Sequence, residues 1–148
     1  MKHWRYLDIT KSSIDVFPNS IVLLYNIQTL KLRENTTELP TQLRKLVNIR
    51  HLEFNWDFFY RTKQMPKKLS RLTQLKTLSY FVVGFDEGCK IEELGPLKYL
   101  KGKLSIFYFE RVKSKKEAMA PRENKIIMIY VLNGVLAKKK RKTLMTMI

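Results

Sequence analysis

The sequence is poor in the side chains from which disulfide frameworks and metal sites are built. Of its 148 residues, one is a cysteine, Cys89, and two are histidines, His3 and His51. A single cysteine excludes an intrachain disulfide framework and fits a reducing compartment. Metal ligands usually come in close pairs, and these three residues show no such spacing, so the sequence predicts no metal site.

Catalytic and nucleotide-binding motifs are also missing. The chain has no G-x-x-x-x-G-K-[ST] phosphate loop, and no Ser/His/Asp set or pair of carboxylates stands out at a spacing that suits catalysis. We therefore expect a protein that is not an enzyme and that uses no cofactor.

Long apolar runs are missing too. No apolar stretch follows the first basic residues, as it would in a secretory signal. The longest run, IIMIYVLNGVLA at 126–137, has 12 residues, whereas a membrane-spanning helix needs about 20. We expect no membrane partner and a cytoplasmic location, with the nucleus as the alternative.

Acidic residues are scarce, above all near the C-terminus. The formal net charge is +16; residues 1–110 hold 18 Lys and Arg against 11 Asp and Glu, and residues 111–148 hold 11 against 2. The basic run KKKRK at 138–142 is typical of nuclear-import or phosphate-binding segments. Only one aromatic residue, Tyr130, accompanies the basic residues of this tail. A nucleic-acid binder is therefore the least favoured function.

What the sequence does contain is an internal repeat. The pattern L-x-x-L-x-L, with any aliphatic or aromatic residue at L, occurs as WRYLDI, IQTLKL, IRHLEF and LKTLSY, which start at residues 4, 27, 49 and 75, and more loosely as KGKLSI from residue 101. A second pattern lies between these copies. FPNSIVLL, LPTQLRKL and MPKKLSRL each place an apolar residue before a proline and aliphatic residues three and six positions after it.

These spacings fit neither a helix of period 3.6 nor a strand of period 2, but they fit a coil made of a short strand, a turn and an irregular or helical return. Apolar positions would point inward, and neighbouring strands would stack in parallel about 4.8 Å apart. Proline suits the return because no ladder partner needs its missing N–H. We predict an α/β leucine-rich-repeat solenoid of four to five repeats over residues 1–112, followed by a divergent basic tail over 113–148.

The stretch 81–112, FVVGFDEGCKIEELGPLKYLKGKLSIFYFERV, is more specific than the repeat itself. It resembles the leucine-rich-repeat region of plant intracellular disease-resistance receptors of the nucleotide-binding type. The resemblance lies in Phe81, Val82, Val83, Gly84, Gly88, Ile91, Glu93, Leu94, Gly95, Leu97, Leu100, Gly102, Leu104, Ile106, Glu110 and Val112. In that family the repeat region restrains a nucleotide-binding switch and helps to recognise pathogen effectors. The resemblance therefore implies a truncated fragment of such a receptor, with the nucleotide-binding domain or an effector as its protein partner.

The tail departs from that family. One hypothesis is that the tail arose by a frameshift in the coding sequence. One choice of codons for VLNGVLAKKKRK, when it is read in another frame, encodes an acidic run that contains tryptophan and resembles the continuation of the family's sequence. The apolar part of the tail, 126–137, could form a strand or a short helix over the last coil, or remain exposed and poorly ordered.

The x residues of L-x-x-L-x-L should form columns on the concave face, about 5 Å apart along each column. A mostly basic column beside one of alternating charge favours an acidic protein partner, or an acidic surface of a switch domain. The alternative is a solvated face without a ligand. The columns read Arg5, Gln28, Arg50 and Lys76, then Tyr6, Thr29, His51 and Thr77, then Asp8, Lys31, Glu53 and Ser79; all except Thr29 and Ser79 are our candidate protein contacts.

The sequence thus predicts a non-enzymatic protein-interaction module that resembles the repeat region of a plant immune receptor. Three alternatives remain open. They are an inactive remnant of a resistance gene, a generic intracellular leucine-rich-repeat adaptor and, least favoured, a basic nucleic-acid binder whose affinity would fall steeply with salt.

Overall fold

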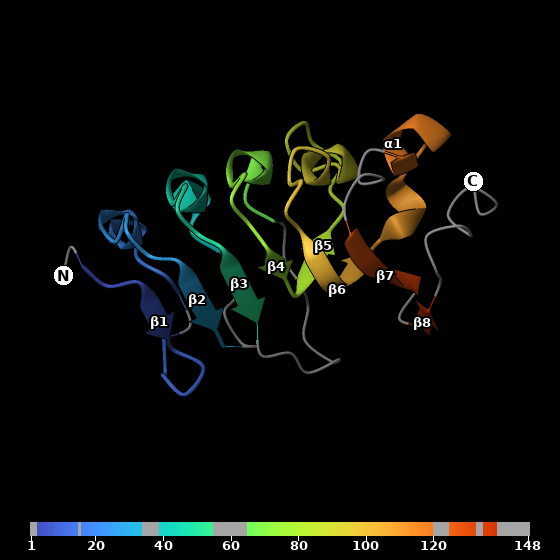
Figure 1. Cartoon of the computed structure of the whole chain (residues 1–148). Coiled ribbons are helices and arrows are strands. Elements are labelled where there is room, and N and C mark those ends of the chain that lie inside the picture. Colours follow the sequence, from blue (N-terminus) through green and yellow to red (C-terminus); the bar gives the residue numbers. More distant parts are fainter. Residues whose placement is uncertain are drawn as a thin grey trace.

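A computed structural model describes residues 3–14, 16–33, 39–54, 65–119, 125–132 and 135–138. Short strands lie side by side along the molecule, and a short helical return stands across each coil from its strand (Figure 1). The chain therefore repeats the strand-and-return unit that the two sequence patterns predict.

The first four strands form one sheet in which all neighbours are parallel. Their order in space is their order in the sequence, as expected when each coil stacks on the one before it. The strands are β1 (Tyr6–Asp8), β2 (Thr29–Leu32), β3 (His51–Phe54) and β4 (Thr77–Leu78).

The register of this sheet aligns the equivalent leucines of successive repeats. Leu30 pairs with Leu52, and Leu52 pairs with Leu78, so the three side chains are adjacent rungs of one buried row. Burial of such rows removes apolar surface from water, and this is the main favourable contribution to stability of the stack. The predicted leucine-rich-repeat fold is confirmed.

The returns are 3-10 helices, because the second sequence pattern places apolar residues three positions apart. In a 3-10 helix residues i and i+3 lie on the same side, so Leu43 and Leu46 both enter the core, and the Leu46 N–H donates to the Leu43 carbonyl at 2.9 Å. Pro40 precedes its helix, where no partner needs the missing N–H. Among the described residues the returns are η1 (Asn19–Leu23), η2 (Thr41–Lys45), η3 (Leu69–Arg71), η4 (Ile91–Leu94) and η5 (Phe109–Arg111).

A second sheet continues the stack beyond a bend at Ser79. The Lys101 N–H donates to the Lys76 carbonyl at 2.9 Å, and the Ser105 N–H donates to the Ser79 carbonyl at 3.2 Å, so the fifth repeat packs directly after the fourth. This sheet has the order β5-β6-β7-β8. Its strands are β5 (Tyr80–Val82), β6 (Lys101–Phe107), β7 (Lys125–Leu132) and β8 (Val135–Lys138). A short helix, α1 (Lys115–Met119), lies between β6 and β7 in the sequence.

The bend corrects one detail of the predicted repeat. The pattern LKTLSY placed Tyr80 in an inward position, in line with Ile106. In the structure Tyr80 is only half-buried against the ring of Phe54, and the fully buried Phe81 pairs with Ile106 instead. The prediction was wrong because the Ser79 hydroxyl accepts a hydrogen bond from the Phe54 N–H at 3.0 Å, and the bend at Ser79 shifts the strand by one residue.

Within the apolar segment 126–137, residues 126–132 and 135–137 lie in strands, which was one of the alternatives left open. Strand β7 pairs with β6 in parallel, and β8 turns back to pair with β7 in the antiparallel direction. The basic run 138–142 lies outside the described residues, apart from the backbone of Lys138. The domain boundary after residue 112 and the frameshift origin of the tail stay predictions.

Replacing a leucine of the buried row should be far more costly than replacing an exposed one. We expect Leu52→Ala to lower the free energy of unfolding by about 2–5 kcal/mol, because it leaves a cavity between two coils. Leu23→Ala is the matched control, since 68% of Leu23 is exposed and surface changes cost within about 0.5 kcal/mol. Urea unfolding followed by circular dichroism measures both, and equal losses would contradict the stacked core.

The single thiol offers a second test of the core. Cys89 is buried, and burial raises the pKa of its thiol, so the reactive thiolate is scarce in the folded chain. We expect slow reaction with dithionitrobenzoate in buffer, complete reaction of one thiol in denaturant, and faster reaction in the Leu52→Ala variant than in Leu23→Ala. A native rate equal to the denatured rate would show that Cys89 is accessible.

Candidate protein-binding face

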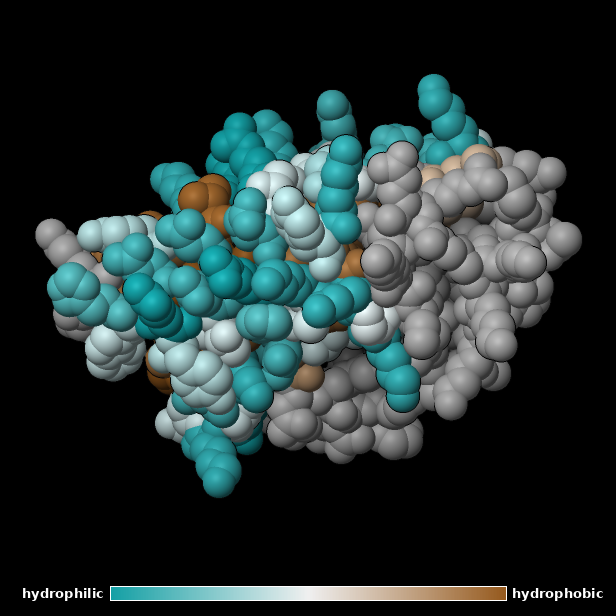
Figure 2. All heavy atoms as spheres, viewed as in Figure 1, coloured by the Kyte–Doolittle hydropathy of each residue, from teal (hydrophilic) through white to brown (hydrophobic). Residues whose placement is uncertain are grey.

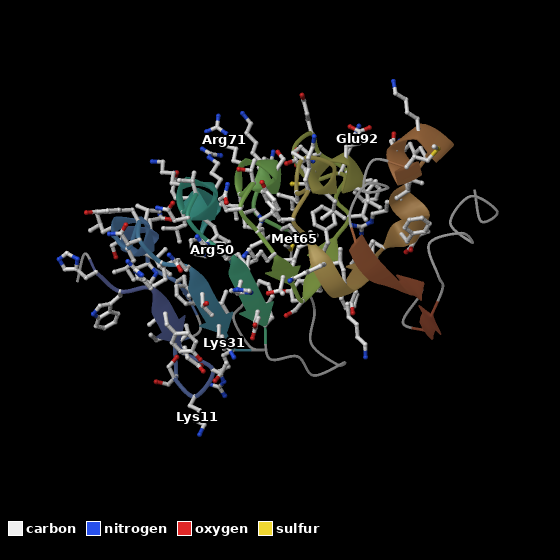
Figure 3. All side chains as sticks on the ribbon, viewed as in Figure 1. Lys11, Lys31, Arg50, Met65, Arg71 and Glu92 are labelled. Carbon is white, nitrogen blue, oxygen red and sulfur yellow. The ribbon has the colours of Figure 1, made fainter. Side chains whose placement is uncertain are left out.

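The ten candidate contacts lie on the side of the first sheet that faces away from the core. Arg5, Tyr6, Asp8 and Arg50 are exposed, and the other six are half-buried. Figure 3 shows Lys31 and Arg50 toward the strands, whereas Arg71 and Glu92 lie along the returns. We call this surface the strand face and define it by Arg5, Tyr6, Asp8, Gln28, Lys31, Arg50, His51, Glu53, Lys76 and Thr77.

The backbone register forms all three predicted columns. In the second column Tyr6 pairs with Thr29, Thr29 with His51, and His51 with Thr77. In the third, Lys31 pairs with Asp8 on one side and with Glu53 on the other. The first column is joined by hydrogen bonds of 2.7–2.8 Å from the backbone N–H of one member to the carbonyl of the previous one, along Arg5, Gln28, Arg50 and Lys76.

The charged side chains of the third column all have partners nearby. Lys31 Nζ lies 3.1 Å from Glu53 Oε2, and this hydrogen-bonded ion pair raises the pKa of Lys31. Asp8 Oδ1 accepts hydrogen bonds from the hydroxyl and the backbone N–H of Thr10 at 2.7 and 3.0 Å, which lower the pKa of Asp8. The Tyr6 hydroxyl donates to the other oxygen of Asp8 at 3.2 Å. This column therefore presents fixed dipoles, and its formal net charge is −1, from Asp8 and Glu53 against Lys31.

The second column connects two coils through side chains. His51 Nδ1 and Thr77 Oγ1 are 2.9 Å apart, which is hydrogen-bond distance between adjacent rungs. Both side chains are half-buried, so the contact is partly shielded from water. It holds the middle of the strand face in one arrangement.

The first column keeps its charge available. Within the part of the chain that the structure describes, Arg5, Arg50 and Lys76 form no ion pair with an acidic side chain. Their positive charge is therefore not cancelled locally and contributes to the field outside the sheet.

The structure extends this column beyond the residues that the sequence singled out. Because the Lys101 N–H bonds to the Lys76 carbonyl, Lys101 stands one rung after Lys76, and both Lys101 and Lys103 are exposed. The looser copy KGKLSI puts Lys101 in its leading slot and Gly102 in the slot of the first column, so the sequence pattern does not predict Lys101 in this row. The basic row therefore includes Arg50, Lys76 and Lys101 on three successive coils.

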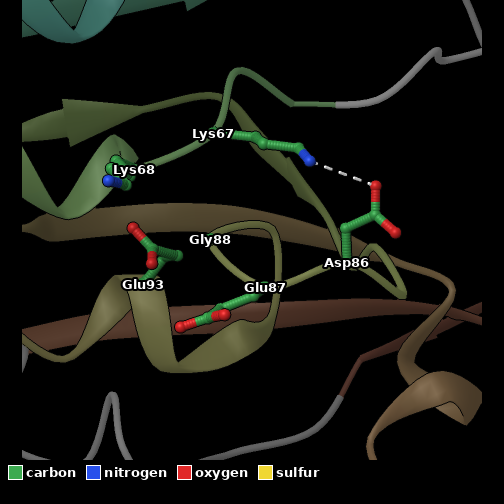
Figure 4. A pocket seen from close by; sticks show the side chains of 6 residues that line it. All are labelled: Lys67, Lys68, Asp86, Glu87, Gly88 and Glu93. Atoms are coloured by element: carbon green, nitrogen blue, oxygen red, sulfur yellow. Dashed lines mark ion pairs between the residues drawn. The ribbon is translucent and has the colours of Figure 1, made fainter.

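A hollow of about 530 Å³ lies at the start of the returns η3 and η4 (Figure 4). Three of its five charged side chains have partners: Lys67 Nζ is 3.3 Å from Asp86 Oδ2, and the Glu93 carboxylate accepts the backbone N–H of Ser70 at 3.0 Å. With both signs of charge mixed, the hollow favours no class of ligand. Its lining residues are Lys67, Lys68, Asp86, Glu87, Gly88 and Glu93.

Outside the strand face, the described residues show no metal-binding cluster and no membrane-spanning helix. Figure 2 shows hydrophilic side chains over most of the described surface on the side in view, with small hydrophobic areas between them. Among the residues that the structure describes, no three His, Cys, Asp or Glu side chains are grouped so that they could hold a metal ion. In the same part of the chain, no helix has the length and apolar character that crossing a membrane requires.

Comparison with known proteins agrees with the geometry. Residues 1–142 match the model of a protein family described as a leucine-rich repeat region. A segment of 55 residues is 44% identical to the putative disease resistance protein RGA4 of Solanum bulbocastanum; it makes up 37% of this chain and 6% of that protein. The chain thus matches only a small part of this relative's length. Both findings confirm the predicted resemblance to the repeat region of plant disease-resistance proteins.

The ion pair of the third column can be tested by titration. We expect Glu53→Gln to lower the pKa of Lys31 toward its ordinary value, because the carboxylate that stabilises the ammonium form is gone. The pair stabilises the folded chain below the pKa that Lys31 has when unfolded, and this contribution is lost as the pH rises through the raised folded value. NMR titration of the lysine side chains measures the shift. Glu92→Gln, an exposed change on η4, is the control, and an equal shift in both variants would contradict the pairing.

Proposed function

This chain belongs to the family of leucine-rich repeat regions, and we propose that it is the part of a plant disease-resistance receptor that binds another protein through its strand face. Repeat stacks of this kind are typically non-enzymatic and use an extended face to hold a partner. The partner is recognised by side chains between the leucines, since the leucines themselves are buried.

The basic row is the observation that supports this proposal. Arg50, Lys76 and Lys101 stand on three successive coils about 4.8 Å apart, and within the described residues none of them is paired with an acidic side chain. A row of like charges is unfavourable unless something of opposite sign meets it. The row therefore favours a partner with an acidic surface.

The neighbouring columns would supply selectivity. The Lys31–Glu53 pair and the His51–Thr77 contact present donors and acceptors in fixed positions. A partner must match these groups as well as the charge of the row, because polar groups left unpaired at an interface are costly. The exposed ring of Tyr6, close to Lys31, adds an aromatic side chain of the type common at binding hot spots.

The nucleotide-binding domain of a resistance receptor is the partner that fits best. The chain itself has no phosphate loop, so a nucleotide-driven switch has to be supplied by other residues. Contact between the basic row and an acidic surface of that domain would restrain the domain at rest. Binding of a pathogen effector to the same face would compete with the contact and release the switch.

Reversal of charge in the basic row tests the proposal. We expect the double variant Arg50→Glu and Lys76→Glu to weaken binding to a nucleotide-binding domain from a plant disease-resistance receptor at least about tenfold, because attraction becomes repulsion. Pull-down and calorimetry with the purified domain measure the loss. Wild-type binding should weaken as the salt concentration rises.

A double variant with the same change in charge serves as the control. Lys45→Glu and Arg71→Glu alter exposed residues on the returns η2 and η3, away from the strands. We expect this variant to bind like the wild type. Unchanged binding by the Arg50 and Lys76 variant, or an equal loss in both, would show that the strand face is not the docking surface.

A further inference from the structure

An arginine between two aromatic rings lies just beyond the ends of β5 and β6, outside the strand face. The central guanidinium carbon of Arg111 is 4.3 Å from the ring centre of Phe85 and 4.0 Å from that of Tyr108. Phe85 follows β5 and Tyr108 follows β6, and these two strands are paired neighbours. Strand β6 also pairs with β7, so the cluster lies within the stack of coils. We call Phe85, Tyr108 and Arg111 the arginine clamp.

The backbone holds the clamp in one arrangement. Tyr108 has a φ of 57°, in the left-handed region that residues other than glycine rarely adopt. Its carbonyl accepts the Arg111 N–H at 3.0 Å, and this 3-10 turn places the two side chains on the same side of η5. Nη1 of Arg111 donates to the Val83 carbonyl at 2.9 Å, which ties the guanidinium to the preceding coil. Strained residues of this kind persist where other contacts fix them, and they cluster at ligand-binding positions.

The clamp has binding capacity that the described structure does not use. A guanidinium has several N–H donors, and Arg111 pairs with no acidic side chain among the described residues. Phe85 is 66% exposed and Tyr108 is 37% exposed. Rings that served only the core would be buried, whereas exposed aromatic rings beside an arginine have the composition of a binding hot spot.

We propose that the arginine clamp binds one carboxylate side chain of a protein partner, and that apolar residues on either side of this carboxylate pack on the two rings. A carboxylate matches the planar fork of the guanidinium, which can donate two parallel hydrogen bonds to it. The rings orient the guanidinium before binding, so little side-chain freedom is lost when the carboxylate arrives. This contact is separate from the basic row and does not depend on the proposed function.

Acidic residues around the clamp favour a partner with a single negative charge. Asp86 and Glu87 directly follow Phe85, Glu110 directly precedes Arg111, and all three acidic residues are exposed. They repel a phosphate group or a nucleic acid more strongly than a lone carboxylate, because the repulsion grows with the charge of the ligand. A segment with one carboxylate between apolar residues therefore fits the clamp better than a polyanion does.

Peptide titration of the full chain tests the clamp. The probe is the peptide acetyl-Leu-Asp-Leu amide, and the readout is the NMR shift of the Arg111 Nε–H and of the ring protons of Phe85 and Tyr108. We expect saturable shifts at all three residues. The peptide acetyl-Leu-Asn-Leu amide has the same shape without the charge, and we expect it to cause no shift. Inorganic phosphate should bind more weakly than the aspartate peptide.

Two variants separate binding from a purely structural role. Arg111→Lys keeps the charge but removes the planar fork, so the aspartate peptide should bind at least about tenfold more weakly. Phe85→Leu removes one wall of the clamp and should weaken binding about threefold. The midpoint of its thermal unfolding should stay unchanged, because most of the Phe85 side chain is exposed.

Tyr99→Leu is the matched control, since Tyr99 is 60% exposed and lies at the opposite end of β6. It should bind the aspartate peptide like the wild type. The Arg50→Glu and Lys76→Glu double variant should also bind this peptide like the wild type, so the clamp and the strand face can fail independently.

Equal shifts with the two peptides, or tighter binding of phosphate than of the aspartate peptide, would overturn the proposal. So would the absence of shifts at the clamp, a folded Arg111→Lys variant that binds like the wild type, or equal losses in Phe85→Leu and Tyr99→Leu. A Phe85→Leu variant that loses stability but keeps full binding would show that the clamp only holds the loop in place.

Discussion

The structure depends on one constraint, which is that a single coil cannot bury its own leucines. A strand of four residues and a single turn of 3-10 helix leave their inward side chains open on two sides, and only the adjacent coils close them. Leu52 shows this directly, because it is fully buried between Leu30 and Leu78 in one row. Trp4 shows the reverse case, since the same kind of position on the first coil is half exposed.

The same stacking determines what the protein presents to a partner. Parallel strands in register bring residues separated by 22 to 26 positions in the sequence onto neighbouring rungs. The consequences differ between columns that lie side by side. Lys31 meets Glu53 and is neutralised, whereas Arg50 meets Gln28 and Lys76 and keeps its charge. The basic row is therefore a product of register as much as of composition.

The stretch 81–112, which carries the resemblance to resistance receptors, contributes contacts that are not part of the general repeat. The guanidinium of Arg111 lies 4.3 Å from the Phe85 ring centre and 4.0 Å from that of Tyr108, and it donates a hydrogen bond to the Val83 carbonyl at 2.9 Å. At Gly84 any larger side chain would meet Cys89, since an added Cβ would lie 2.6 Å from the Cys89 Cβ. These contacts give residues other than the leucines a structural role in this stretch.

The spacing of leucines and prolines determined the coil, the direction of stacking and the membership of the three columns, because each of these follows from which residues must be buried. Tertiary structure alone decided the bend at Ser79, the inward position of Phe81 and the strands at 126–132 and 135–137. In these places the sequence is apolar over several consecutive residues, so burial can be satisfied in more than one register and a neighbouring hydrogen bond makes the choice. Tertiary structure also decided whether a charged side chain on the strand face forms an ion pair. The pairing depends on which side chain stands on the next rung and on whether that side chain is long enough to reach the charge.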